Sequence, residues 1–281
     1  MNQPVIITKA DGKKESFDRQ KLINSLKNAG GAEAIISDIV KHVEGEMYNN
    51  MPTSEIYRRA FRLLREHSMP IAVKYSLRRA LSELGPDGFP FEKYVARIFQ
   101  TRGYETLTDQ TVVGGCVPHE VDVVAWNKEK LVMVEAKFHN EFILKSDLKV
   151  VLYIKARFDD IRSSTYNYGG MARKLDEGWL VTNTKFTDQA IKYGECQNIK
   201  MVGWNYPRKG NLQDIIEELR LHPFTCLVSL SNVNKKNLLA RGVGLCTDLL
   251  ENPTYFKEIG MSVEQEKKVI EEVEIVCGIN L

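Results

Sequence analysis

Residues 119–140 read HEVDVVAWNKEKLVMVEAKFHN, and this stretch decides how the middle of the chain is expected to fold. Two apolar runs, VDVVA and LVMVEA, flank the polar segment WNKEK, which predicts two strands joined by a short turn. Side chains alternate faces along a strand, so Glu135 and Lys137 would lie on the same face. If the turn folds the strands antiparallel, Asp122 would come alongside Glu135.

These charged residues predict a particular chemistry. Two carboxylates that converge in an apolar setting repel each other, and burial raises their pKa values unless a cation joins them. A hard divalent cation such as Mg²⁺ is the usual partner. With a lysine to orient or deprotonate water, such a set can hydrolyse a phosphodiester. The hairpin is therefore a candidate metal-dependent hydrolytic site.

The flanking sequence places the hairpin in a mixed sheet. An amphipathic helix, FEKYVARIFQTRG, precedes it, and a helix is expected over residues 147–160. A strand GWLVTN, a helix TDQAIKYGEC and a strand KMVGW follow. Two adjacent strands followed by alternating helix and strand predict an α/β sheet sandwiched by helices.

Two breaks divide the chain into three segments. LGPDGFP (84–90) and YPRKGN (206–211) have turn or linker composition. We therefore expect an α/β multidomain protein with domains over 1–85, 88–207 and 210–281. The first would be a small helical domain with a β-hairpin that turns at Asp11-Gly12, and the last would be helical throughout.

Composition narrows the class of protein. With 43% hydrophobic and 27% charged residues, the chain is typical of globular proteins. No run of about 18 apolar residues occurs, and charged residues come too early for a signal peptide, so we expect a cytoplasmic protein. The five cysteines form no CxxC pair, which disfavours a disulfide framework or a zinc site. Net charge is only +2, so a DNA site would have to be a local patch.

The middle segment resembles the PD-(D/E)xK nuclease superfamily, most closely its Mrr-like restriction endonuclease branch. GGCVPHEVDVVA, VEAKFHN and WLVTNTKFTDQA carry the resemblance, which covers residues 88–206. It implies metal binding by Asp122, Glu135 and the backbone carbonyl of Ala136, with Lys137 as the catalytic lysine. Glu92 would be an extra acid, and Glu120 and His119 supporting groups. His139 is more simply a surface or core histidine.

The first segment resembles the ATP-cone, a nucleotide-sensing module of ribonucleotide reductases. TKADGKKESFDRQKL and MPTSEIYRR carry the resemblance, over about residues 3–85. Ammonium groups on a strand and the next helix can reach phosphates. By this resemblance, Lys9 and Lys21 would contact the phosphates of the nucleotide. Glu15, Asp18 and Thr53 would contact its sugar or base, and Tyr57 would border the base. The apolar slot for the base would be formed by Ile7, Phe17, Leu22 and Ile56.

This module departs from its family at Ala10, where a second basic residue is usual, which leaves the choice between tri- and diphosphate open. ATP and dATP are the expected ligands. No GxxxxGK[ST] motif occurs in the sequence, so the nucleotide is expected to regulate the protein and not to fuel it. ATP-cones often change subunit association, so a nucleotide-dependent homo-oligomer is expected.

The last segment loosely resembles a helix-hairpin-helix unit in LSNVNKKNLLARGVGLCTDLLEN. Such a hairpin offers backbone N–H groups to DNA phosphates. Gly242 and Gly244 would form it, with Lys235, Lys236 and Arg241 as the basic cluster. Helices that bind another protein are an equal alternative.

The segments combine into one leading hypothesis, a Mg²⁺- or Mn²⁺-dependent DNA endonuclease regulated by ATP or dATP and acting on foreign DNA or in DNA processing. The alternative is a nucleotide-responsive DNA-binding regulator whose nuclease fold binds without cutting. A third hypothesis has the core acting on RNA or branched DNA.

Overall fold

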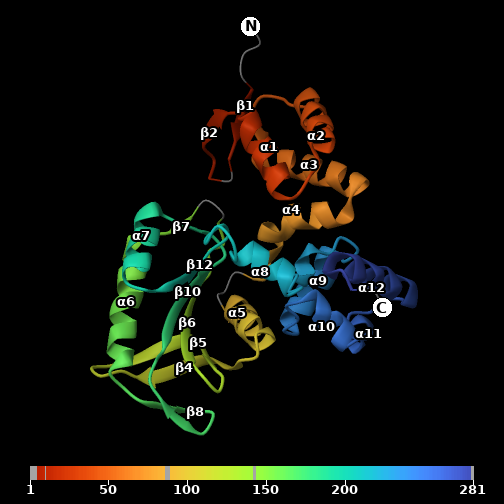
Figure 1. The fold of residues 1–281 in the computed structure, drawn as a ribbon. Helices are drawn as coiled ribbons and strands as arrows, with labels where there is room; N and C mark the ends of the chain where they lie inside the picture. The colour runs from red at the N-terminus through yellow and green to blue at the C-terminus, as the bar shows by residue number, and fades with distance from the viewer. Residues whose placement is uncertain (1–4, 10, 86–88, 142–143, 280–281) are drawn as a thin grey trace. The chain divides into compact units, whose positions relative to one another are not determined.

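The computed structural model of the chain describes residues 5–9, 11–85, 89–141 and 144–279 (Figure 1). The chain divides into two compact units, a smaller one of residues 1–77 and 271–281 and a larger one of residues 78–270. The division falls within helices α4 (Met69–Ser82) and α12 (Val263–Cys277). Ala10 and residues 86–88 of the LGPDGFP break lie outside the described residues.

The smaller unit opens with the expected hairpin, β1 (Ile6–Thr8) and β2 (Lys14–Ser16), paired antiparallel. The two-residue strand β3 (Met51–Pro52), which the sequence did not predict, pairs parallel with β1. Ile7 of β1 and Met51 of β3 share one core with helices α1 (Arg19–Asn28), α2 (Glu33–Gly45) and α3 (Thr53–His67).

The core of the smaller unit comes from the apolar faces of its helices. Leu26 of α1, Val40 of α2 and Leu64 of α3 are fully buried in one cluster, as expected where amphipathic helices pack their apolar faces together. Truncating one of these leucines to alanine would cost about 2–5 kcal/mol, because the cavity left behind closes only in part. Asp18 starts α1, since its side chain accepts hydrogen bonds from the N–H groups of Gln20 and Lys21.

The larger unit is built on a five-stranded sheet of order β12-β10-β6-β5-β4. Its strands are β4 (Glu105–Val113), β5 (Pro118–Trp126), β6 (Leu131–Lys137), β10 (Glu177–Thr182) and β12 (Lys200–Val202). β4, β5 and β6 pair antiparallel, whereas β6, β10 and β12 pair parallel. The sequence did not predict β4, whose polar, threonine-rich run ETLTDQTVV suits an edge strand.

Helices cover both faces of this sheet, which makes the expected α/β/α sandwich. α5 (Phe89–Thr101) lies on one side, and α6 (Leu148–Arg162) and α7 (Asp188–Cys196) lie on the other (Figure 1). Ile154 and Phe158 of α6 are fully or almost fully buried in one cluster with Val124, Met133 and Leu180 of the sheet. Asp122 shares its strand face with Val124, and Glu135 shares its strand face with Met133, so the two carboxylates lie on the side of the sheet that α6 covers.

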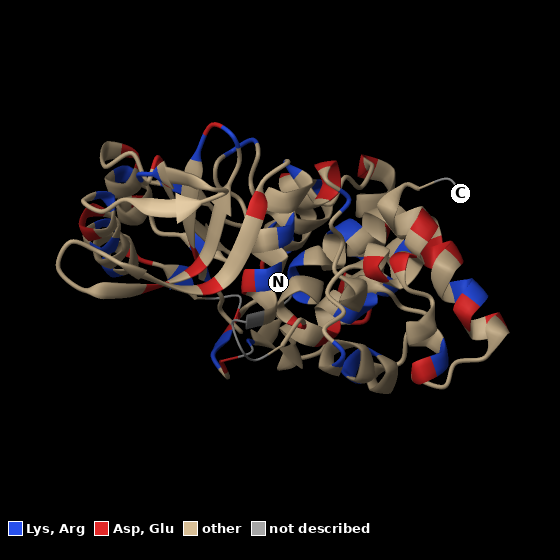
Figure 2. Cartoon of the chain, turned by 90° about the horizontal axis from the view of Figure 1, so that it is seen from below, with Lys and Arg blue, Asp and Glu red and all other residues tan. Residues whose placement is uncertain are grey.

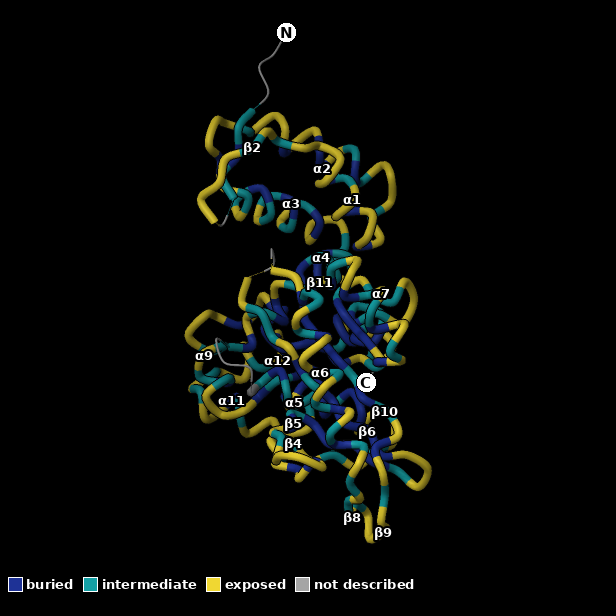
Figure 3. Tube along the Cα trace, turned by 90° about the vertical axis from the view of Figure 1, so that its left-hand side faces the viewer, coloured by how far each residue is buried: buried dark blue, intermediate teal, exposed yellow. Residues whose placement is uncertain are grey.

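The larger unit also contains four short strands outside the five-stranded sheet. β7 (Lys145–Ser146) pairs with β11 (Lys185–Phe186), and β8 (Tyr166–Tyr168) forms a hairpin with β9 (Met171–Arg173). Figure 3 shows β6 and β10 as largely buried strands, whereas β8 and β9 are exposed or half-buried. The candidate site is therefore carried by the most buried strands of the sheet.

The C-terminal segment is helical, as expected. It contains α8 (Leu212–Glu218), the short 3-10 helix η1 (Phe224–Cys226), α9 (Asn232–Ala240), α10 (Cys246–Glu251), α11 (Thr254–Glu258) and α12. Acidic and basic residues are interspersed along the chain (Figure 2). Within the described ranges, no helix combines the length and apolar character needed to cross a membrane.

Candidate functional site

The candidate hydrolytic site lies where β5 and β6 run side by side under α6. Val123 pairs with Val134, so continuing the antiparallel register by one residue sets Asp122 opposite Glu135. Asp122 Oδ2 accepts a 2.6 Å hydrogen bond from the Ala136 N–H. The structure thus brings together the two carboxylates that the hairpin pattern singled out.

Burial makes both carboxylates costly to ionise. It raises the pKa of Glu135 to about 7, and the neighbouring charge of Asp122 adds to the effect. Burial also raises the pKa of Asp122, although the Ala136 N–H and the charge of Arg157 act against the increase. A cation placed between the two groups would lower both pKa values, so the pair is suited to binding one.

Lys137 and Glu120 are exposed and border the pair. The positive charge of Lys137, at the end of β6, lowers the pKa of both Asp122 and Glu135. The negative charge of Glu120, two residues before Asp122 on β5, raises the pKa of Asp122. Both predicted residues are therefore within electrostatic range of the pair.

Glu92 and Asp109 add negative charge to the site. Glu92, in the first turn of α5, has a pKa raised to about 7, first by burial and then by the charges of Asp122 and Asp109. Asp109 was not predicted. It has a left-handed φ of 54° and lies between the pairs Thr108–Val123 and Gln110–Val121, opposite Asp122. A strand residue in this conformation has no clear signal in the sequence.

Arg157 is a second residue that the sequence analysis missed. It comes from α6, ion-pairs with Glu135 and donates a 3.0 Å hydrogen bond to the backbone carbonyl of Glu120. Its side chain is only 12% exposed. The segment ARFDDIR predicts a helix, but the sequence does not show which of its charges points toward the sheet.

The two histidines near the hairpin have structural partners. His119 Nε2 lies 2.7 Å from Asp160 Oδ2, and Asp160 also accepts from the N–H groups of Cys116 and Val117. His139 Nε2 lies 3.1 Å from Ser146 Oγ, and its backbone exchanges two hydrogen bonds with the side chain of Asn183. The contacts of His119 and Asp160 hold the β4–β5 turn in place, and those of His139 hold the chain that follows β6.

The donor set fits a divalent cation. In the described part of the chain, no group of three or more His, Cys, Asp or Glu side chains is arranged to hold a metal ion. A metal would therefore rely on Asp122, Glu135 and the carbonyl of Ala136. Oxygen ligands of this kind suit Mg²⁺ or Mn²⁺, with water completing the coordination. The two raised carboxylate pKa values are the observation that favours such a cation.

The predicted phosphate-binding lysines meet on one side of the smaller unit. Lys9 Nζ lies 2.6 Å from Glu15 Oε2, and Lys21 Nζ lies 3.5 Å from Glu15 Oε1 and 3.9 Å from Asp18 Oδ2. Hydrogen bonding to Lys9 lowers the pKa of Glu15. The two predicted phosphate-binding lysines thus share the carboxylate of Glu15.

The predicted apolar slot is only partly open. Ile7, Leu22 and Ile56 are at most 7% exposed and belong to the core, whereas Phe17 is half-buried. Tyr57 stacks on Phe61 and on Tyr75, with ring centroids 6.1 and 5.1 Å apart. Tyr75 was not predicted.

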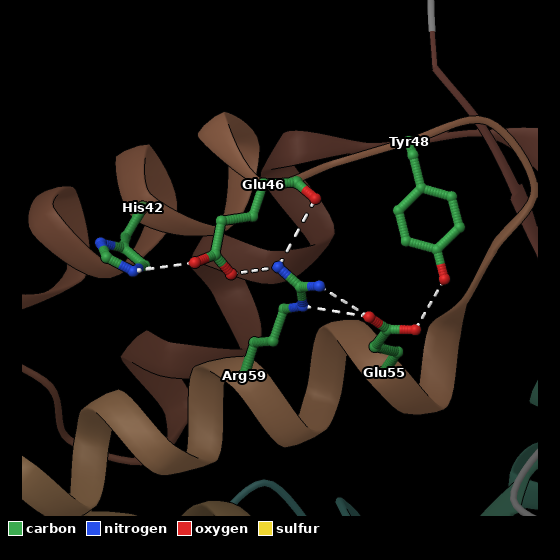
Figure 4. A network of polar contacts seen from close by, with 5 residues as sticks. All are labelled: His42, Glu46, Tyr48, Glu55 and Arg59. Carbon is green, nitrogen blue, oxygen red and sulfur yellow. Dashed lines mark hydrogen bonds and ion pairs between the residues drawn. The ribbon is translucent and has the colours of Figure 1, made fainter.

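Thr53 and Asp18 sit at helix starts. Thr53 is the first residue of α3. Asp18 Oδ1 already accepts hydrogen bonds from the N–H groups of Gln20 and Lys21 and so caps α1. A polar network fixes the loop before Thr53 (Figure 4). In it, Arg59 ion-pairs with Glu46 and Glu55, Tyr48 Oη donates to Glu55 over 2.8 Å, and His42 lies 3.3 Å from Glu46.

The C-terminal hairpin forms, but its polar groups are engaged within the chain. Gly242 has a left-handed φ of 79°, and the N–H groups of Gly244 and Leu245 donate to Asp248 Oδ2 over 2.9 and 2.8 Å. Arg241 ion-pairs with Glu258 at 3.1 Å, and Lys235 donates to the Thr225 carbonyl. Lys236 is exposed. The DNA-binding assignment therefore stays a prediction.

A cavity of about 530 Å³ lies beside this hairpin, between it and α5. Arg97 of α5 lines the cavity and pairs with Asp248 at 3.6 Å and Glu251 at 3.3 Å. Arg97 is thus shared by two carboxylates of this wall.

Family models match each of the three segments. Residues 5–84 match the ATP cone domain, residues 85–205 a restriction endonuclease domain and residues 222–277 the C-terminal region of AF1548-like proteins. The resemblances to an ATP-cone and to an Mrr-like restriction endonuclease are thereby confirmed. The C-terminal match is to the AF1548-like region and not to a helix-hairpin-helix family.

Relatives and solved structures agree with these matches. An uncharacterized protein of Archaeoglobus fulgidus is 34% identical over 188 residues, which span 66% of this chain and 100% of that protein. The crystal structure of AF1548, a protein of unknown function, is 33% identical with a TM-score of 0.53, and the match covers 69% of this chain and 100% of that one.

A more distant likeness is to the MspJI restriction endonuclease in complex with an oligonucleotide. It is 15% identical with a TM-score of 0.37 and covers 71% of this chain and 39% of that one, which is too weak to bear on function. The family assignment rests on the 34% and 33% sequence identities, because both matches cover the full length of the matched protein. The chain belongs to the AF1548-like family and joins an ATP cone to a restriction endonuclease-like domain and an AF1548-like C-terminal region.

Proposed function

We propose that this protein is a divalent-metal-dependent DNA endonuclease whose activity or assembly is regulated by ATP or dATP. The observation that carries the proposal is the half-buried pair of Asp122 and Glu135 beside Lys137, with further acids within electrostatic range. Acidic groups outnumber basic ones there, so the site needs an additional cation. The restriction endonuclease match over the same residues supports a nuclease.

Each residue has a role in this proposal. Asp122, Glu135 and the Ala136 carbonyl would hold the metal, which when bound supplies a Lewis acid for the scissile phosphate. Lys137 orients the attacking water and stabilises the charge that develops on the phosphate oxygens. Glu92, half-buried with a pKa of about 7, can take up or release a proton near neutral pH.

The nucleotide would act through the smaller unit. Lys9 and Lys21 would bind its phosphates, with Glu15 exchanging its ion pairs for a contact to the sugar or base. We also place the domain boundaries at the two breaks, giving domains over 1–85, 88–207 and 210–281. The family matches over 5–84, 85–205 and 222–277 are compatible with this division.

Plasmid cleavage tests the proposal. Supercoiled and linear DNA are incubated with Mg²⁺ or Mn²⁺, with and without ATP or dATP. We expect cleavage by the wild type and a loss of about 100-fold or more in Lys137→Ala and Glu135→Gln. Lys128→Ala is the matched control, because this exposed lysine lies in the turn of the same hairpin.

One observation favours the alternative of a DNA-binding regulator without nuclease activity. Arg157 already pairs with Glu135, and the Ala136 N–H already bonds to Asp122, so the carboxylates are partly satisfied without a metal. If wild type and Lys137→Ala are equally inert with every metal and nucleotide while both bind DNA, the nuclease proposal fails and the regulator stands. Offering RNA and branched DNA in the same assay tests the third hypothesis.

A further inference from the structure

Arg157 is held in the site by more contacts than an ion pair with Glu135 needs. Its Nη1 donates to Glu135 and, over 3.0 Å, to the carbonyl of Glu120, while Nη2 donates over 2.9 Å to Tyr153 Oη. A guanidinium that is only 12% exposed has lost most of its hydration. Such a charge is stable only when several acceptors fix it in place.

Tyr153 fixes the orientation of the guanidinium. It lies one helical turn before Arg157 on α6, so the two side chains share a face of the helix. Arg157 Cζ lies 4.8 Å from the centroid of the Tyr153 ring, a cation–π contact. The tyrosine itself is 61% exposed. Nη1 of Arg157 therefore faces Glu135 and the Glu120 carbonyl, while the Tyr153 ring that Arg157 contacts lies at the solvent-exposed surface.

The Nε–H of Arg157 is a buried donor that makes no hydrogen bond with any group in the described ranges. An acceptor from outside reaches it only when the guanidinium or the side chain covering it shifts. A buried donor left without an acceptor costs about 1–3 kcal/mol. The guanidinium fork is matched to two oxygens of one phosphate or carboxylate, so an incoming anionic oxygen would complete the set.

We propose that Arg157, supported by Tyr153, binds a non-bridging oxygen of the phosphodiester that the site cleaves. This inference rests on the proposed nuclease function and adds a substrate-binding residue to it. Arg157 then has two tasks: it neutralises Glu135 in the free protein, and it anchors the DNA backbone at the reacting phosphate. A phosphate oxygen is the acceptor favoured here, because Nη1 and Nη2 already donate to Glu135, the Glu120 carbonyl and Tyr153, which leaves Nε–H for a group that the substrate brings.

DNA binding without divalent metal separates this role from a structural one. The affinity for a duplex is measured in EDTA by fluorescence anisotropy at several salt concentrations, for wild type, Arg157→Met, Arg157→Lys and Tyr153→Ala. Loss of one phosphate contact lowers the slope of log affinity against log salt by about 1. We expect that decrease in Arg157→Met, with about tenfold weaker binding, and most of the wild-type slope in Arg157→Lys.

Arg162→Met is the matched control, since Arg162 lies on the same helix and pairs with Asp159, at 3.7 Å, away from the two carboxylates of the site. Tyr153→Ala alters an exposed side chain, so it keeps the test valid if the Arg157 variants do not fold. It should weaken DNA binding about twofold to fivefold. Calorimetric Mn²⁺ titration provides an independent readout, and Arg157→Met should bind Mn²⁺ at least as tightly as the wild type.

The failures are distinguishable. If the wild type binds and cleaves DNA but the Arg157 and Tyr153 variants keep its affinity and salt slope, the phosphate role is wrong and Arg157 only balances Glu135. Weaker Mn²⁺ binding in Arg157→Met together with an unchanged salt slope would equally exclude the phosphate role. If the wild type neither binds nor cleaves DNA, the proposed function fails and this inference fails with it.

Discussion

Asp122 and Ala136 are joined across β5 and β6 by a 2.6 Å hydrogen bond from the backbone N–H of Ala136 to Asp122 Oδ2. The N–H and C=O of a strand residue point toward the same neighbouring strand, so the Ala136 carbonyl also faces β5. The short residue between Glu135 and Lys137 thus contributes its backbone to the site. This explains why its side chain can be a small apolar one.

Replacing the charge of Asp122 without changing its shape should separate folding from metal binding. In Asp122→Asn the amide oxygen still accepts from the Ala136 N–H, and a buried charge is removed, so the free energy of unfolding should stay the same or rise by about 1 kcal/mol. Mn²⁺ affinity, measured by calorimetry, should fall more than about tenfold. Glu129→Gln, in the exposed turn between β5 and β6, is the control. Equal Mn²⁺ affinity in Asp122→Asn and wild type would remove Asp122 from the metal site.

The packing of α6 on the sheet depends on a glycine. A Cβ at Gly178 of β10 would fall well inside contact distance of the Phe158 ring, which is 1% exposed. Gly178→Ala should therefore destabilise the protein by about 1–3 kcal/mol in urea unfolding. Adding Phe158→Leu should recover part of this loss, because the smaller side chain leaves room for the methyl group. Additive losses in the double variant would show that the two residues do not share this space.

Local pattern predicted the pair of Asp122 and Glu135, because alternation and a short turn determine which residues of a hairpin face each other. It could not predict Arg157, because the position of that side chain depends on how α6 packs on the sheet. It also could not predict Asp109, because this residue adopts a left-handed backbone conformation inside an edge strand. The apolar slot of the ATP cone stays a prediction for a related reason. Ile7, Leu22 and Ile56 have the same sequence signal whether they line a ligand or fill the core, and the structure puts them in the core.

Asp160 should make stability depend on pH in the acid range. Its bond to His119, with help from the N–H groups of Cys116 and Val117, lowers its pKa from the ordinary 3.8 to about 2. A lowered folded-state pKa gives stability that is present above pH 3.8 and is lost as pH falls through about 2. Asp160→Asn should be less stable than wild type at neutral pH, and the difference should shrink as pH falls toward 2.

Urea unfolding at a series of pH values measures this difference. Asp159→Asn is the matched control, because this neighbouring side chain is 51% exposed and its ion pairs are with Lys155 and Arg162 of its own helix. A constant gap between wild type and Asp160→Asn down to pH 2 would contradict the assigned bond.

The nucleotide site can be tested on the smaller unit's own lysines. Lys9→Ala should weaken ATP and dATP binding about tenfold in calorimetric titration, because a charge-assisted phosphate contact is lost. Lys21→Ala should have a smaller effect, since the side chain of Lys21 is 67% exposed. Lys13→Ala is the control, from a lysine that is 80% exposed and pairs with Asp11 on the same hairpin. Wild-type affinity in the Lys9 and Lys21 variants would place the nucleotide elsewhere, and light scattering with and without ATP tests whether it changes subunit association.

The C-terminal hairpin offers a test of DNA contact, because Asp248 occupies the N–H groups that a DNA phosphate would need. Its carboxylate accepts from Gly244 and Leu245 and lies 3.6 Å from Arg97. Asp248→Ala should cost about 1 kcal/mol of stability through the lost cap. In Asp248→Asn the side-chain oxygen can still accept a hydrogen bond from one backbone N–H, while the negative charge that repels DNA phosphates is removed. If the hairpin touches DNA, this variant should bind a duplex more tightly in anisotropy measurements. Lys236→Ala should bind the duplex more weakly. If neither variant changes DNA affinity, these helices do not bind DNA, and the alternative of a protein partner is favoured.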